Sequence, residues 1–172
     1  MKNLFSLKDI KHTEHNIFKL FDNDWLLLTA GNKTNFNPMT ISWGTMGILW
    51  NRPVVICFVR PQRYTLQLMQ QNGIFTLSAF PPTMKKVLNL CGSVSGRDVN
   101  KVSEAGITPM DTPRGGIAFE EAVMYVECQK IYHDQIKKDS FTDSSLISTF
   151  YPASDFHHLF IGEITGWYEK SL

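Results

Sequence analysis

The chain has 172 residues, with 17 Lys and Arg against 16 Asp and Glu, so its formal net charge is +1. A hydrophobic fraction of 43% excludes a disordered chain and is typical of a globular domain. The near-zero net charge gives no electrostatic basis for a nucleic-acid or an anionic-membrane partner. We expect a single domain over residues 1–172, whose core needs no metal or disulfide.

The cysteines and the first residues predict a cytoplasmic protein. The opening MKNLFSLKDIKH lacks the apolar centre of a signal peptide, and no apolar run reaches the length of about 18 residues that spans a membrane. Cys57, Cys91 and Cys128 are odd in number and form no CxxC pair, which is typical of a reducing compartment. We expect Cys57 and Cys128 to be small buried side chains, while Cys91 is either buried or close to a ligand.

Six short β-prone runs follow one another along the chain, and each is bounded by Gly, Pro or polar residues. They are residues 24–31, 39–50, 52–61, 73–82, 122–133 and 157–169. Helical patterns are short: one ends at Gly73, one begins with Thr83 as N-cap, and one runs from Asp98 to Gly106. Segment 139–155 fits either a helix or a mobile loop. This order predicts a mainly β fold, an antiparallel barrel with short peripheral helices.

Familiar catalytic motifs do not occur in the sequence. It has no GxGxxG, no GxxxxGK[ST], no HExxH and no GxSxG. His157 and His158 are adjacent, so on a strand they point to opposite faces and cannot share a metal ion. Each of them has either a structural role or a place at a binding site. We nominate no catalytic residue and no metal site, and an enzyme with this sequence would take its chemistry from a cofactor.

Residues 35–47, NFNPMTISWGTMG, combine hydrogen-bonding and apolar side chains without any charge. Asn37, Thr40 and Ser42 offer donors and acceptors, while Met39 and Trp43 can pack against a flat apolar face. The segment therefore suits a planar heteroaromatic ligand such as a flavin. The alternative is a twisted strand with Trp43 in the core.

Two further segments suit a phosphate. In RPQRYT, the side chains of Arg60, Arg63 and Thr65 surround the start of a predicted helix, where free N–H groups favour an anion. In CGSVSGRDVNK, residues 91–101, glycines allow close approach and Ser95, Arg97 and Lys101 add donors. The alternatives are solvated arginines for the first segment and a flexible loop with a helix cap for the second. A planar ring with one phosphate corresponds to FMN.

The ordered set of segments resembles the flavin reductase-like family with an FMN-binding split barrel, particularly its flavoredoxin-like branch. The resemblance is carried by NPMTISWGTMG (37–47), VRPQRYT (59–65), FTLSAFP (75–81), CGSVSGRDVNK (91–101) and HLFIGEI (158–164). It implies a six-stranded antiparallel Greek-key split barrel that forms a homodimer, with FMN near the dimer interface. Segment 139–155 departs from the family pattern.

The resemblance also implies the cofactor-binding residues. Those that would line the isoalloxazine and the ribityl chain are Asn37, Pro38, Met39, Thr40, Ser42 and Trp43. Those that would lie toward the phosphate are Arg60, Arg63 and Thr65. Those that would complete the site from a loop are Ser95, Gly96, Arg97 and Lys101.

Three functions remain open at this point. The first is an NAD(P)H-dependent flavin oxidoreductase, in which FMN accepts a hydride at N5. The second is a flavoredoxin-type electron carrier, which takes electrons from a redox protein and has no direct NAD(P)H activity. The third is a non-enzymatic module that holds haem or another flat ligand, which is disfavoured because the sequence offers no well-placed axial ligand.

Overall fold

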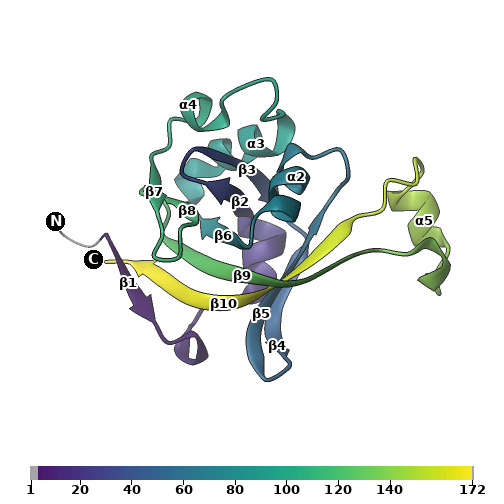
Figure 1. Cartoon of the computed structure of the whole chain (residues 1–172), viewed down its shortest axis with the longest axis horizontal. Helices are drawn as coiled ribbons and strands as arrows, with labels where there is room; N and C mark the ends of the chain where they lie inside the picture. Colours follow the sequence, from purple (N-terminus) through teal and green to yellow (C-terminus); the bar gives the residue numbers. More distant parts are fainter. Residues whose placement is uncertain (1–3, 172) are drawn as a thin grey trace.

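The computed structural model describes residues 4–171. Its centre is an eight-stranded antiparallel sheet with the strand path β3-β2-β6-β9-β10-β5-β4, and β1 pairs with β10. The strands of this sheet are β1 (Phe5–Lys8), β2 (Leu26–Asn32), β3 (Asn35–Ile41), β4 (Gly44–Leu49), β5 (Arg52–Val59), β6 (Ile74–Ala79), β9 (Met124–Gln135) and β10 (His158–Lys170). Figure 1 shows β9 and β10 sweeping across the molecule, with α5 at the far end of their hairpin.

This architecture confirms the mainly β, antiparallel prediction, although the strand count differs. All six predicted runs contain strand, but the run over 39–50 divides at Ser42 and Trp43 into the end of β3 and the whole of β4. Strand β1 adds an eighth member, and β7 (Pro109–Asp111) pairs with β8 (Ile117–Phe119) in a separate small sheet. The two strands of the divided run lie at opposite ends of the strand path.

Tight connections form two of the hairpins. In the β2–β3 turn, the Asn32 side chain accepts hydrogen bonds from the backbone N–H groups of Thr34 and Asn35, each at 3.1 Å. In the β4–β5 turn, Trp50 and Asn51 have φ values of 51° and 57°. Two successive positive φ values are typical of the turn whose twist matches the flanking strands. Within residues 4–171, β3 and β4 do not pair with each other, so the barrel stays split along that seam.

The helices are short and lie at the periphery. They are α1 (Ile17–Lys19), α2 (Tyr64–Gln71), α3 (Lys85–Ser93), α4 (Lys101–Ala105) and α5 (Ser145–Phe150). Helices α2 and α3 contact β2 and β3, as Figure 1 also shows. Across residues 4–171, every helix is too short to cross a bilayer.

Three predicted helix ends need correction. Helix α2 ends with Asn72 as C-cap instead of Gly73, because the Asn72 backbone and side chain both bond to the Leu68 carbonyl. Thr83 lies within a 3₁₀ turn, Pro82–Met84, that precedes α3, so it is not the N-cap. Helix α4 begins after Asn100, whose side chain accepts from the Ser103 N–H, and not at Asp98. Its end at Gly106, in the left-handed conformation, is confirmed.

Strand β2 separates two hydrophobic clusters. Leu26 and Leu28 point into the barrel, while Leu27 points to the outer cluster beneath α3 and the β7–β8 sheet, and all three are fully buried. The three cysteines are free and buried, which confirms the expectation for Cys57 and Cys128 and decides it for Cys91. Burial raises the pKa of the Cys57 thiol to about 12, so it acts as a small apolar side chain.

Residues 136–157, which join β9 to β10, form what we call the arm. It contains a 3₁₀ turn (Lys138–Ser140) and helix α5, so segment 139–155 is partly helical. Its base holds a cluster of aromatic rings, with Tyr151 stacked on Phe156 at a centroid distance of 4.8 Å. Arg60 of the barrel donates to the Phe150 carbonyl at 2.8 Å and pairs with Asp155. These contacts fix the arm to the end of β5.

Replacing Gly31 by Ala should destabilise the fold strongly. Gly31 has a φ of +114°, and an added Cβ would lie 2.2 Å from the Asn35 carbonyl oxygen. We expect the free energy of unfolding to fall by about 2–4 kcal/mol, measured by urea denaturation. The control is Gly47→Ala, where an added Cβ meets nothing within 4 Å and the expected change is within about 0.5 kcal/mol. Equal effects of the two variants would contradict this account of Gly31.

Candidate functional site

A hollow of about 320 Å³ lies where β3 ends and β4 begins. Its walls come from β3 and the following link, from β5 and the residues after it, and from the end of the arm. They comprise Met39, Thr40, Ile41, Ser42, Trp43, Phe58, Arg60, Gln62, Arg63 and His157. Met39, Gln62 and Arg63 also line a smaller hollow of about 130 Å³ at the start of α2, together with Thr65, Ser95, Gly96 and Lys101. The three segments singled out by sequence therefore meet at one continuous site.

The wall formed by β3 carries no charge, and side-chain hydrogen bonds to α2 and α3 hold it in place. The Asn37 amide is buried and donates to the Thr65 hydroxyl at 2.7 Å, which ties β3 to α2. Met39 is buried and lines both hollows, and the Thr40 hydroxyl donates to the Leu88 carbonyl. Pro38 carries no N–H, which an edge strand tolerates. These contacts fix the path of β3 along the site.

Ser42 and Trp43 form the rim of the larger hollow. Both are exposed, and Trp43 retains 43% of its accessible surface. The Trp43 indole lies 5.1 Å from the His157 ring and 5.5 Å from the Phe150 ring, measured between centroids. The alternative of Trp43 as a core residue is therefore wrong, and its ring is available to a ligand.

Two cations, the half-buried Arg63 and the buried Lys101, lie at the α2 end of the site. Arg63 donates to the Gly92 carbonyl at 2.7 Å. Lys101 is only 4% exposed, and its ammonium donates to the Pro38 and Cys91 carbonyls at 3.0 and 2.8 Å. Burial, reinforced by the nearby Arg63 charge, lowers the pKa of Lys101 to about 8.

This end of the site fits an anionic group. Within residues 4–171, none of the residues that line the smaller hollow is acidic, so the two positive charges lack a carboxylate partner there. A phosphate would supply the missing negative charge and accept from Arg63, Lys101 and the Thr65 hydroxyl. The donor set therefore fits the phosphate of FMN.

The loop after α3 closes the site from one side. Ser95 accepts from the Arg97 backbone N–H at 3.2 Å, and both Ser95 and Gly96 line the smaller hollow. A Cβ on Gly96 would lie 1.8 Å from the Asn37 side-chain oxygen, so only glycine lets the loop approach β3 this closely. Arg97 lies 5.0 Å above the Tyr64 ring and lines an adjoining polar hollow, outside the two that form the site.

Arg60 lines the larger hollow, but its guanidinium is bound to the arm. It pairs with Asp155 and donates to the Phe150 carbonyl, and Gln62 also donates to Asp155, at 3.1 Å. The charge of Arg60 is thus already compensated within the protein. The structure brings Arg63, Thr65 and Lys101 together and places Arg60 toward the arm.

Comparison with known proteins decides the family. The sequence model of the flavin reductase like domain matches residues 19–171. The chain belongs to the flavin reductase-like family. No protein of curated function matches the sequence.

Solved structures of the family share the fold. A flavoredoxin from Methanosarcina acetivorans is 22% identical, with a TM-score of 0.67 over 95% of this chain and 76% of that one. An FMN-binding domain of a flavin reductases-like enzyme from Shewanella baltica OS155 is 15% identical, with a TM-score of 0.69 over 99% and 79%. An NADH:FAD oxidoreductase from Streptomyces globisporus C-1027 is 16% identical, with a TM-score of 0.65 over 85% and 75%.

Several residues that line the two hollows were not singled out by the sequence interpretation. Gln62 and Tyr64 lie inside the RPQRYT segment, whose arginines gave the stronger signal for a phosphate site. His157 was left between two roles, and the structure places it in the larger hollow, with its Nδ1 2.9 Å from the Tyr151 hydroxyl. Burial, reinforced by the Arg60 charge, lowers the pKa of His157 to about 4, so the imidazole is neutral at pH 7.

The buried His157 should make the fold sensitive to mild acid. Between pH 6.5 and 4 the unfolded chain binds a proton at His157 that the folded chain does not, so stability falls as the pH falls. This one group should contribute a loss of about 3 kcal/mol over that interval, measured by urea denaturation. His157→Gln should lessen the pH dependence, because the variant lacks the group that titrates. An unaltered pH dependence in His157→Gln would contradict the assignment.

Proposed function

We propose that this chain binds FMN at the seam between β3 and β4 and acts as an NAD(P)H-dependent flavin reductase. The observation that carries the proposal is the pairing of two features in one site. A neutral, hydrogen-bonding wall from Met39 to Trp43 leads to the half-buried Arg63 and the buried Lys101, and within residues 4–171 none of the side chains that line the smaller hollow is acidic. A planar ring joined to one phosphate matches this arrangement, with the ring on the neutral wall and the phosphate beside the two cations.

In this proposal, the ring lies toward Met39, Thr40, Ser42 and Trp43, and the phosphate lies toward Arg63, Thr65 and Lys101, with the ribityl chain between them. Asn37 and Pro38 act from behind, since they hold Thr65 and Lys101 in place. Ser95 and Gly96 close the phosphate end, while Arg60 lines the ring end and Arg97 borders the site. Bound FMN would supply reversible two-electron chemistry, with N5 as the position that would take a nicotinamide hydride.

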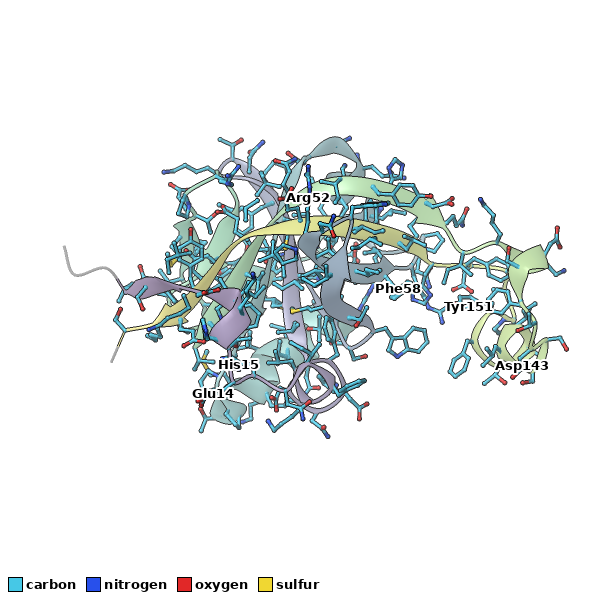
Figure 2. All side chains as sticks on the ribbon, turned by 90° about the horizontal axis from the view of Figure 1, so that it is seen from below. Glu14, His15, Arg52, Phe58, Asp143 and Tyr151 are labelled. Carbon is cyan, nitrogen blue, oxygen red and sulfur yellow. The ribbon has the colours of Figure 1, made fainter. Side chains whose placement is uncertain are left out.

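The protein contributes binding, orientation and exclusion of water. Phe58 and His157 close the ring end beneath the Trp43 rim, and Figure 2 places Phe58 on the barrel and Tyr151 at the base of the arm. The neutral His157 places no charge beside the flavin, so its imidazole can form a hydrogen bond with the ring without favouring either the oxidised or the reduced flavin by its charge. We assign no general acid or base.

A flavoredoxin-type electron carrier is the second candidate. It is favoured by the exposure of Trp43 at the rim, since an electron-transfer partner needs an accessible cofactor edge. The similarity to the Methanosarcina flavoredoxin supports the same reading. In this candidate a redox protein replaces the nicotinamide nucleotide as the donor.

We also propose that two copies assemble through the β4–β5 side of the barrel. Ile48 and Trp50 are exposed by 71% and 59% there, on a hairpin that begins at the seam. Exposed apolar side chains that are grouped, unlike single ones, mark an interaction site. We propose that this dimer is cytoplasmic, because three free and buried thiols are typical of a reducing compartment.

The first experiment is the absorbance spectrum of the purified chain, followed by chromatography of any released ligand against FMN, FAD and riboflavin. Flavin bands with FMN released would support the site. Rapid anaerobic bleaching of those bands by NADH or NADPH would favour the reductase, whereas bleaching only by a reduced redox protein would favour the carrier. A colourless chain that also fails to bind added FMN would overturn both.

Arg63→Ala should weaken FMN binding by about 1.5–3 kcal/mol, because it removes a charge-assisted bond to the phosphate. Riboflavin lacks the phosphate, so its affinity should be almost unchanged. Fluorescence titration of both flavins checks the difference. The control is Arg52→Ala, which removes an exposed arginine paired with Glu163 and should alter neither affinity. Equal losses for FMN and riboflavin would place Arg63 away from the phosphate.

A further inference from the structure

A separate hollow, of about 580 Å³, lies between the arm and the barrel. Its apolar walls come from Trp43, Phe141, Leu146, Phe150, Tyr151 and Leu159. Most of these residues belong to the arm. The site proposed for FMN does not use them, apart from Trp43.

The charges near this hollow compensate each other. Asp134 and Lys137 line it and pair at 3.2 Å, and Asp134 also accepts from the Tyr132 hydroxyl at 3.1 Å. No net charge therefore remains to attract an ionic ligand. Ser140 and Gln135 add neutral hydrogen-bonding groups to the walls.

The hollow is held open by contacts on both sides of the arm. Arg60 donates to the Phe150 carbonyl at 2.8 Å. Gln135 donates to the Phe156 carbonyl at 3.1 Å, and the Ile136 N–H donates to the His157 carbonyl at 2.9 Å. The arm is thus fixed at its entry and its exit, which gives a preformed cavity.

Trp43 separates this hollow from the site at the seam, because its indole lines both. On the arm side it meets the Phe150 ring edge-on, with an interplanar angle of 87°. A compound in this hollow would lie among the rings of Trp43, Phe141, Phe150 and Tyr151. Such surroundings favour an aromatic ligand through offset or edge-on ring contacts.

We propose that the hollow between the arm and the barrel is a second binding site, which takes a neutral, planar aromatic compound. Its volume lies within the range of about 300–1,000 Å³ that is usual for small-molecule sites. Its apolar walls, compensated charges and aromatic rings match that chemistry. Binding there depends on the arm and not on FMN.

The test is calorimetric titration of the full-length chain with 2-naphthol, and with 2-naphthoate as its charged counterpart. 2-Naphthol should bind the natural sequence at least about tenfold more tightly than 2-naphthoate, because a carboxylate in apolar surroundings loses its hydration. Leu146→Asp, at a position 42% exposed on α5, should weaken 2-naphthol binding by at least about tenfold for the same reason.

Leu7→Asp is the matched control, since Leu7 is 64% exposed on β1 and does not line the hollow. It should bind 2-naphthol as the natural sequence does. If Leu146→Asp does not fold, Leu146→Gln should show the same direction of change. Circular dichroism and thermal unfolding check that each variant keeps its fold.

Equal binding of 2-naphthol to Leu146→Asp and to the natural sequence would overturn the proposal, as would equal binding of the two probes. Dissociation of a dimer by Leu146→Asp, with no heat from 2-naphthol in the natural sequence, would also overturn it, because a second copy would then occupy the hollow. If the chain binds 2-naphthol but does not bind FMN, the proposed function is overturned and the proposal of a second site stands.

Discussion

The structure depends on a link of two residues. Ser42 and Trp43 join β3 to β4, which are the two outer strands of the sheet path. Three peptide steps separate Ile41 from Gly44, so their Cα atoms lie within about 11 Å of each other. A flat sheet would place its outer strands much farther apart. The link therefore requires the sheet to roll until its two edges nearly meet, and the place where they meet is the site.

That geometry explains why a neutral strand and a cluster of cations come together. Rolling the sheet leaves one edge of β3 facing the start of α2 and the loop after α3. Lys101 then crosses from α4 to the Pro38 and Cys91 carbonyls, which joins three elements through one buried ammonium. Burying that charge costs free energy, and the two carbonyl bonds offset part of the cost. A phosphate beside it would offset more.

Local sequence patterns predicted the elements well, because hydrophobic alternation and turn residues act over short distances. The strand runs, the Gly106 cap and the three site segments all came from such signals. Run 39–50 is rich in β-prone residues such as Ile41, Trp43 and Thr45, so its composition does not reveal the division at Ser42 and Trp43, which the strand path shows. The local pattern and the resemblance both placed Arg60 with Arg63 toward the phosphate, whereas its partner Asp155 is 95 positions away and no local pattern encodes that pair. Likewise, the hollow behind Trp43 arises from contacts between the arm and β5, which no local pattern encodes.

The split barrel leaves two strand edges, and they are protected unequally. Strand β3 is covered by α3 and carries Pro38, which cannot donate a backbone hydrogen bond. Strand β4, with the sequence GTMGIL, has neither a proline nor a charge, and its cover consists of contacts from α1 and of the Phe21 ring against Gly44. Uncharged open edges are templates for strand addition between molecules. Aggregation of an isolated chain would therefore begin at β4. A single lysine on that edge would suppress it, because strand addition would then bury a charge.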